Sequence, residues 1–445
     1  MSDKGGYQSK FLWTVGTFGL SAVLKFASSI ILSWLLAPSI LGVVVVVNTV
    51  RLGVEILTDI GVEQNIVHHR DGLEPYFRNT AWTIQVVRGL ILTLVFAAAA
   101  PWLAHVYGID TSLFLVAALT PAIGGLHSIA TLALVKGVAV RRRNLFELTC
   151  EMLALLTQIG LALWLRSVWA PVLGLVVATA IRTGLSYTLP DPWQRFGFDR
   201  EVAMRMLRFG RWIMITSLVM YAAMSLDRLY LGRVAPLALL GIYGIARNIA
   251  ELPTTLSRRM SYQIIFPALA RAAEGDRAGQ MRAIAGSRLT VILIGCGGLA
   301  AAAGVADRLV AFVYDPRYAA AGWMLSVLLL GGVFAVLSNL NEALLLSAGR
   351  PGYSSVANTT RLATLAVLLP GGYALAGMSG AVAAVALTEA AQYGYIGLGL
   401  RRVGLHFWRQ DAAAIALAAI VFAAILLGRM ALGWGNPLAG WGPFA

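Results

Sequence analysis

Charged side chains recur at helical spacing inside two long apolar segments of this chain. In the first segment Arg51 and Glu55 are four residues apart, and in the second Arg247 and Glu251 repeat that spacing. Residues three or four apart share one face of a helix. An ionisable side chain at the middle of a membrane costs about 2.5–3.5 kcal/mol, so such a face is expected to meet protein or a wet cavity instead of lipid.

The basic groups of these segments are suited to binding phosphate, because guanidinium and ammonium groups donate charge-assisted hydrogen bonds to its oxygens. The polar faces therefore predict a cavity that binds a phosphate-bearing ligand. A simpler interpretation is that each arginine only forms an ion pair with the glutamate four residues on. The residues predicted to line the cavity are Lys25, Asn48, Arg51, Glu55, Tyr243, Arg247, Glu251 and Arg361.

Acidic side chains in the apolar segments could instead bind a coupling cation, Na+ or H+. Asp59 extends the first polar face by one further turn, Asp227 precedes the second polar face, and Glu342 lies in a later apolar segment. For each of these acids, an ion pair with a nearby arginine is the alternative interpretation. No other cofactor is expected.

The composition indicates that these residues belong to a membrane protein. The 445-residue chain is 58% hydrophobic and 13% charged, whereas soluble domains average about 25% charged residues. Long apolar runs favour membrane-spanning helices over a β-barrel, and a span needs about 20 residues. We therefore predict an all-α polytopic membrane protein with about 12–13 transmembrane helices. The expected spans are 11–36, 41–66, 80–104, 112–136, 145–166, 169–189, 210–232, 237–266, 284–304, 321–347, 353–376, 379–400 and 412–428.

The positions of the basic residues predict the orientation of the chain. With the N-terminus in the cytoplasm, most arginines and lysines outside the spans fall in cytoplasmic loops, as the positive-inside rule requires. The formal net charge of +14 is then largely a topology signal. Nucleic-acid binding is not needed to explain it.

An internal repeat relates the two polar faces. Arg51 and Arg247 are separated by the same number of residues as Glu55 and Glu251. The repeat predicts two pseudo-symmetric six-helix bundles around a central cavity, which can rock to open that cavity to either side. The predicted domains are an N-terminal lobe at 1–189, a cytoplasmic linker at 190–209, a C-terminal lobe at 210–400, and an additional hydrophobic segment with a tail at 401–445.

Three stretches of the chain resemble the polysaccharide transporter family, within the flippase superfamily that also holds multidrug efflux transporters and lipid II flippases. The resemblance covers about residues 10–400. The stretches are Leu35-Leu36-Ala37-Pro38-Ser39-Ile40-Leu41-Gly42 with Asp59-Ile60-Gly61, Asp227-Arg228-Leu229-Tyr230-Leu231-Gly232 with Leu240-Gly241-Ile242-Tyr243, and Tyr314-Asp315-Pro316-Arg317-Tyr318.

This resemblance implies a flippase that works by alternating access in the bacterial cytoplasmic membrane. Its implied substrate is an undecaprenyl-diphosphate-linked oligosaccharide, moved from the cytoplasmic to the outer leaflet. The resemblance further implies that Lys25, Arg51 and Arg247 contact the diphosphate or acidic sugars. The implied partners are the lipid-linked sugar, membrane lipids, and polysaccharide polymerase or export proteins.

The residues argue against three other functions. A multidrug efflux antiporter of the same superfamily would use an acid in the first span, where this chain has Lys25 and no acid. A lipid II flippase usually has fourteen spans, and no fourteenth is evident here. A membrane glycosyltransferase or ligase needs catalytic side chains on a sizeable outer loop, whereas the longest expected outer loop, 305–320, has few charged residues and the five histidines are scattered. We therefore expect neither an enzyme nor a metal site.

Overall fold

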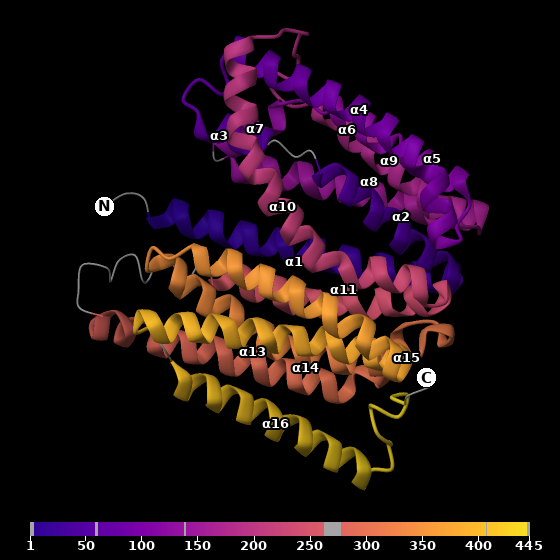
Figure 1. Ribbon diagram of the computed structural model, residues 1–445, viewed down its shortest axis with the longest axis vertical. Helices are drawn as coiled ribbons and strands as arrows, with labels where there is room; N and C mark the ends of the chain where they lie inside the picture. The colour runs from indigo at the N-terminus through magenta and orange to yellow at the C-terminus, as the bar shows by residue number, and fades with distance from the viewer. Residues whose placement is uncertain (1–3, 58–60, 138, 262–276, 406, 443–445) are drawn as a thin grey trace. The chain divides into compact units, whose positions relative to one another are not determined.

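The computed structural model describes residues 4–57, 61–137, 139–261, 277–405 and 407–442, and these ranges contain helices and no β-strand (Figure 1). The predicted all-α fold is confirmed. The chain separates into two compact units. Unit 1 consists of Met1–Tyr221 and Gly232–Ala238, and unit 2 of Ala222–Leu231 and Leu239–Ala445. The long helix α10 (Arg200–Val234) therefore contributes residues to both units.

Unit 1 contains long helices connected by short turns, together with one crossing that is broken into pieces. Proline starts two of the long helices at the position where its missing N–H is tolerated, and Gly108 ends one of them in a left-handed conformation. The helices are α1 (Lys4–Leu35), α2 (Pro38–Ile56), α3 (Val62–His68), α4 (Pro75–Tyr107), α5 (Thr111–Ala117), α6 (Thr120–Gly125), α7 (Ala130–Lys136), α8 (Val140–Leu165) and α9 (Trp169–Ser186).

The broken crossing runs through α5, α6 and α7, which bend by 60° at the break before α7. Breaking a helix leaves carbonyl groups that need donors, since lipid supplies none. Gln85 of α4 donates its Nε2 to the carbonyls of Gly125 and His127, each at 3.0 Å. The side chain of Thr183 on α9 donates to the carbonyl of Ile123 at 3.1 Å. Neighbouring helices thus satisfy the backbone at the break.

Close approach between α4 and α6 depends on Gly89, because a Cβ built there would clash with the carbonyl oxygen of Pro121. We expect Gly89→Ala to destabilise the protein by about 1–3 kcal/mol, the typical cost of overpacking. The measurement is the thermal unfolding midpoint of the purified protein in detergent. Gly160→Ala on α8 is the matched control, since no atom lies within 4 Å of its built Cβ. Equal unfolding midpoints for the two variants would contradict the prediction.

The predicted linker is held against unit 1 by hydrogen bonds. The backbone N–H groups of Gly197 and Asp199 donate to Thr83 and Thr80 of α4, each at 3.0 Å. The adjoining first turns of α10 insert Val202 and Met206 into a buried cluster with residues of α3 and α4. These contacts make residues 197–206 part of the packing of unit 1.

Unit 2 is built around α14 (Ala321–Ser347), which is buried along nearly its whole length and lies between α13 (Arg277–Val313) and α15 (Gly352–Val403) (Figure 1). Helix α15 contains two helices joined at a sharp break. At Gly377 the break has a φ of 58° and a ψ of −138°, a conformation essentially restricted to glycine. The other helices are α11 (Leu237–Met260) and α16 (Trp408–Ala431).

One motif of the family resemblance forms a tight turn in unit 2. Residues Pro316–Tyr318 form the short 3-10 helix η2, and Asp315 caps it by accepting from the backbone N–H of Arg317 at 2.9 Å. The side chain of Arg317 also donates to Asp315 at 2.7 Å, and these hydrogen bonds lower the pKa of Asp315. Tyr314 and Tyr318 on either side are buried.

Membrane-crossing helices account for most of the described chain. Nine of the described helices are long and apolar enough to cross a membrane, or ten if the bent α5–α7 crossing is included. Each of the expected spans overlaps a described helix. Three of the expected spans are not among these ten. They are α1, whose apolar part is the shorter stretch Gly19–Leu35; α11, which contains Arg247 and Glu251; and one of the two halves of α15, which is counted as a single helix.

Candidate functional site

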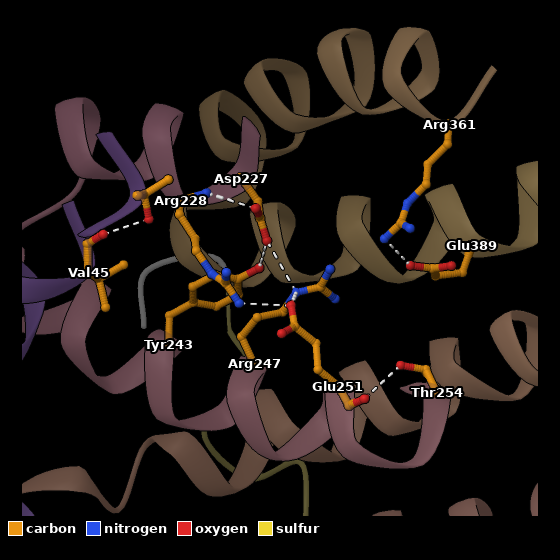
Figure 2. Close-up of polar contacts among 10 residues, drawn as sticks. Val45, Asp227, Arg228, Tyr243, Arg247, Glu251, Thr254, Arg361 and Glu389 are labelled. Atoms are coloured by element: carbon orange, nitrogen blue, oxygen red, sulfur yellow. Dashed lines mark hydrogen bonds and ion pairs between the residues drawn. The ribbon is translucent and has the colours of Figure 1, made fainter. Parts of the chain in front are cut away.

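Unit 2 brings together five charged or hydroxyl-bearing side chains from α10 and α11. Asp227 and Arg228 lie near the C-terminal end of α10. Tyr243, Arg247 and Glu251 follow one another at intervals of four residues on α11, so they share one face of that helix. Figure 2 shows that the five side chains point toward one another. We call this set the arginine network.

The arginine network is a closed chain of ion pairs and hydrogen bonds. The Nε of Arg247 lies 3.4 Å from Oδ2 of Asp227 and 3.1 Å from Oε1 of Glu251. The guanidinium of Arg228 donates to the same Glu251 oxygen at 2.8 Å. The Tyr243 hydroxyl donates to Oδ2 of Asp227. Asp227, Tyr243 and Arg247 are all buried, so the low local dielectric strengthens these contacts.

A second buried ion pair lies in α15, also drawn in Figure 2. Arg361 donates to Glu389 at 2.6 Å, and each side chain is 11% exposed. The two residues belong to the two halves of α15, on either side of the break at Gly377. The arginine network and this pair together contain three arginines and three acidic side chains, so their charges balance.

The polar face of α2 in unit 1 is also organised by ion pairing. Arg51 donates to Glu55 at 2.6 Å, and both its Nε and one terminal nitrogen donate to Oδ1 of Asn48, at 3.2 and 3.0 Å. Arg51 and Glu55 line a cavity inside unit 1, together with Arg88 of α4, whose guanidinium donates to the carbonyl of Glu55. The sequence predicted the Arg51–Glu55 face, whereas the contribution of Arg88 needed the tertiary structure.

The remaining predicted residues lie apart from these clusters. Lys25 of α1 forms an ion pair with Glu151 of α8 at 3.0 Å, and its side chain is 66% exposed. Glu342 is half-buried on α14 and makes no ion pair with another described residue. Asp59 lies outside the described residues. The roles of these residues in binding a substrate or a cation stay predictions.

Sequence reasoning missed a third buried charge cluster, which fixes α16 to unit 2. Arg288 of α13 forms an ion pair with Asp411 of α16 and donates to Asn341 of α14 at 2.7 Å. Tyr393 of α15 donates to the other oxygen of Asp411 at 3.0 Å. Arg288 is fully buried, although its position at the start of an apolar segment resembles that of an ordinary loop arginine. Only packing brings its partners together, because they come from three other helices.

The described residues contain no group of three or more His, Cys, Asp or Glu side chains that could hold a metal ion. What the clusters can do chemically is exchange partners. An arginine held by carboxylates can transfer its hydrogen bonds to phosphate oxygens, because both acceptors fit the same guanidinium geometry. Such an exchange releases a carboxylate, which then favours a proton or a metal cation as its new partner.

Comparisons with known proteins identify the family of this chain. A family model described as "Polysaccharide biosynthesis protein" matches residues 31–322. The chain belongs to this polysaccharide biosynthesis protein family. The family predicted from the sequence motifs is thereby confirmed. A search of curated protein sequences finds no match for this chain.

Solved structures with the same fold are membrane transporters. Lipid II flippase MurJ in an inward closed conformation is 11% identical, with a TM-score of 0.74 over 94% of this chain and 93% of that one. An inward-facing multidrug resistance MATE transporter of the MOP superfamily is 15% identical, with a TM-score of 0.66 over 89% of this chain and 95% of that one. A point mutant of the Vibrio cholerae MATE transporter VcmN is 13% identical, with a TM-score of 0.53 over 89% of this chain and 97% of that one. At these low identities the structural likeness establishes the fold alone. This family member is a multi-pass membrane protein that folds like MOP-superfamily transporters, which have two six-helix bundles.

Proposed function

We propose that this protein is a flippase that moves an undecaprenyl-diphosphate-linked oligosaccharide from the cytoplasmic to the outer leaflet of the bacterial inner membrane. The family match supports a role in polysaccharide biosynthesis, and the fold supports transport as the activity. The observation that carries the proposal is the buried arginine network. Arg247 is 8% exposed, and a charged side chain buried in a membrane protein usually pairs with another charge or marks a ligand or ion pathway.

The arginine network supports a mechanism in which the diphosphate competes with carboxylates for guanidinium groups. Arg247 and Arg228 each contact Glu251, and Arg247 also contacts Asp227. When phosphate oxygens replace the carboxylates in these contacts, a buried carboxylate is left without its cation, which costs several kcal/mol. Uptake of H+ or Na+ by Asp227 or Glu251 removes that cost. Substrate binding and cation binding would then favour each other, as symport requires.

Arg51 and its partners on α2 have a parallel role in this proposal. The Arg51–Glu55 pair has the same spacing and the same partner type as Arg247–Glu251. Arg51 is therefore a second site, where an acidic sugar exchanges with a carboxylate. With the N-terminus in the cytoplasm, the protein receives its substrate from the cytoplasmic leaflet and delivers it to a polymerase or export protein outside.

The direct test is to delete the gene and analyse the extracted lipids by mass spectrometry. Accumulation of a complete oligosaccharide on undecaprenyl diphosphate, with loss of the surface polysaccharide, is the expected result. A plasmid copy of the gene should reverse both changes. Accumulation of lipid II would instead assign the function of the MurJ-like neighbour. Unchanged carrier lipids with increased sensitivity to cationic drugs would assign multidrug efflux.

A further inference from the structure

Unit 1 contains an open cavity of about 680 Å³, whose lining residues are distinct from the arginine network of unit 2. The volume falls within the range of about 300–1,000 Å³ that is typical of ligand sites. Its walls come from α2, α3, α4, α6, α7, α8 and α9 and from the break between α6 and α7. The structure therefore offers a second place where part of the substrate can bind.

The lining of this cavity contains many polar and charged side chains. Half of its lining side chains are polar or charged, and none of the described lining residues is Phe, Tyr or Trp. Pockets for drug-like molecules are mostly hydrophobic and aromatic, so the lack of these aromatic side chains makes the lining less suited to an apolar drug. The charged side chains also balance, with Arg51, Arg88 and Arg182 against Glu55, Glu63 and Glu151. A ligand rich in hydroxyl groups suits such a lining better than a diphosphate does.

Several lining side chains keep hydrogen-bonding atoms available for such a ligand. Gln85 uses its Nε2 on the broken helix, which leaves Oε1 as an acceptor. His127 uses Nε2 on Thr131 at 3.1 Å, which leaves Nδ1. Glu151 uses Oε1 on Lys25, and its buried Oε2 has no donor among the described residues. A buried acceptor without a donor is costly, so a ligand that brings hydroxyl groups would be favoured.

Sugar rings match these requirements, because every hydroxyl group both donates and accepts hydrogen bonds. We propose that the unit 1 cavity is the subsite for sugar residues of the substrate, with Gln85, His127 and Glu151 as ligands to hydroxyl groups. This inference rests on the proposed function, in which the arginine network binds the charged diphosphate.

The predicted orientation supports loading of this subsite from the cytoplasm. Gln85 lies in the first third of α4 and Glu151 in the first half of α8, while Arg182 lies near the end of α9. With the N-terminus in the cytoplasm, these positions fall in the cytoplasmic halves of their spans. A glycan assembled on the cytoplasmic face would therefore meet this cavity first.

A bulky side chain at Gly124 tests the subsite. Gly124 lines the cavity, and the nearest atom to a Cβ built there is Cγ2 of Thr179, at 3.9 Å. Gly124→Ala should therefore fold and bind normally, whereas the phenyl ring of Gly124→Phe should occupy the cavity. The matched control is Gly160→Phe on the exposed side of α8, where a Cβ meets no atom within 4 Å. Glu151→Gln tests the hydroxyl ligand, with the exposed Glu201→Gln as its control.

Two soluble probes allow binding of the glycan and binding of the diphosphate to be measured separately. The first is the oligosaccharide hydrolysed from the carrier lipid of the deletion strain, and the second is inorganic diphosphate. Binding to the purified protein in nanodiscs is measured by calorimetry. We expect Gly124→Phe and Glu151→Gln to weaken oligosaccharide binding by about tenfold or more and to leave diphosphate binding unchanged. Arg247→Ala should do the opposite.

The possible outcomes distinguish failure of the subsite proposal from failure of the proposed function. If the wild type binds the oligosaccharide and Gly124→Phe binds it equally well, the glycan binds elsewhere and the subsite is disproved, while flippase activity stands. If the wild type does not bind the free oligosaccharide, the subsite is also disproved. If the deletion strain accumulates no carrier-linked glycan, both the subsite and the proposed function fail.

Discussion

Replacing Arg247 by alanine is expected to abolish export of the surface polysaccharide. Arg247 is the buried centre of the arginine network, in contact with both Asp227 and Glu251. A hydrogen bond to a charged group contributes about 1.5–3 kcal/mol, so loss of the contact to phosphate should weaken binding about 10- to 100-fold. The measurement is flipping of the lipid-linked oligosaccharide in proteoliposomes. Arg51→Ala should reduce flipping in the same direction.

A double variant separates this loss of function from loss of folding. Arg247→Ala leaves Asp227 buried with one cation fewer, which destabilises the protein. Adding Asp227→Asn removes the uncompensated charge and should recover the unfolding midpoint without recovering flipping. Normal flipping by both Arg51→Ala and Arg247→Ala, at normal membrane levels, would refute a role for these cations in substrate binding.

Replacing Arg288 by methionine is expected to lower the free energy of unfolding by about 3–5 kcal/mol, the usual cost of breaking a buried ion pair. Arg288 is fully buried, and its loss leaves the Asp411 carboxylate with only Asn341 and Tyr393 as donors. Because Asp411 lies at the start of α16, we expect this helix to separate from unit 2 first. The measurement is thermal unfolding in detergent together with protease sensitivity of the segment after Val403.

The pair can be replaced as well as broken, and this gives the control. Buried ion pairs contribute little net stability compared with apolar residues of similar volume. The double variant Arg288→Met with Asp411→Leu should therefore unfold close to the wild-type midpoint. Arg205→Met, which removes an exposed ion pair with Glu201, should change the midpoint very little. A similar midpoint for Arg288→Met and Arg205→Met would show that the buried pair is not needed for stability.

The sequence was sufficient to predict the elements of this fold because the membrane restricts what they can be. A segment such as 321–347 is too long and too apolar to be anything except a buried or membrane-crossing helix, and α14 occupies those residues. Helical spacing also predicted the in-helix pairs. Arg51 with Glu55 and Arg247 with Glu251 are close because four residues make about one turn. The helices and these in-helix pairs depend only on local geometry, so the spacing of residues in the sequence predicts them directly.

Contacts between helices were decided by the tertiary structure alone. Asp227 reaches Arg247 and Tyr243 only because α10 and α11 pack against each other at that level. Gln85 reaches the carbonyls at the break before α7 only because Gly89 allows α4 and α6 to approach closely. No spacing within one segment encodes these distances, since they depend on how helices pack.

The sequence by itself determined that this is an all-α membrane protein of the polysaccharide biosynthesis family, with charged residues on two related helical faces. Apolar run length, helical period and short motifs carry that information locally. The tertiary structure decided that those charges form ion-pair networks, that a fully buried Arg288 fixes α16, and that unit 1 contains a cavity lined by charged side chains. The physical reason is that desolvated charges must find partners wherever packing brings them together, and those partners lie on other helices.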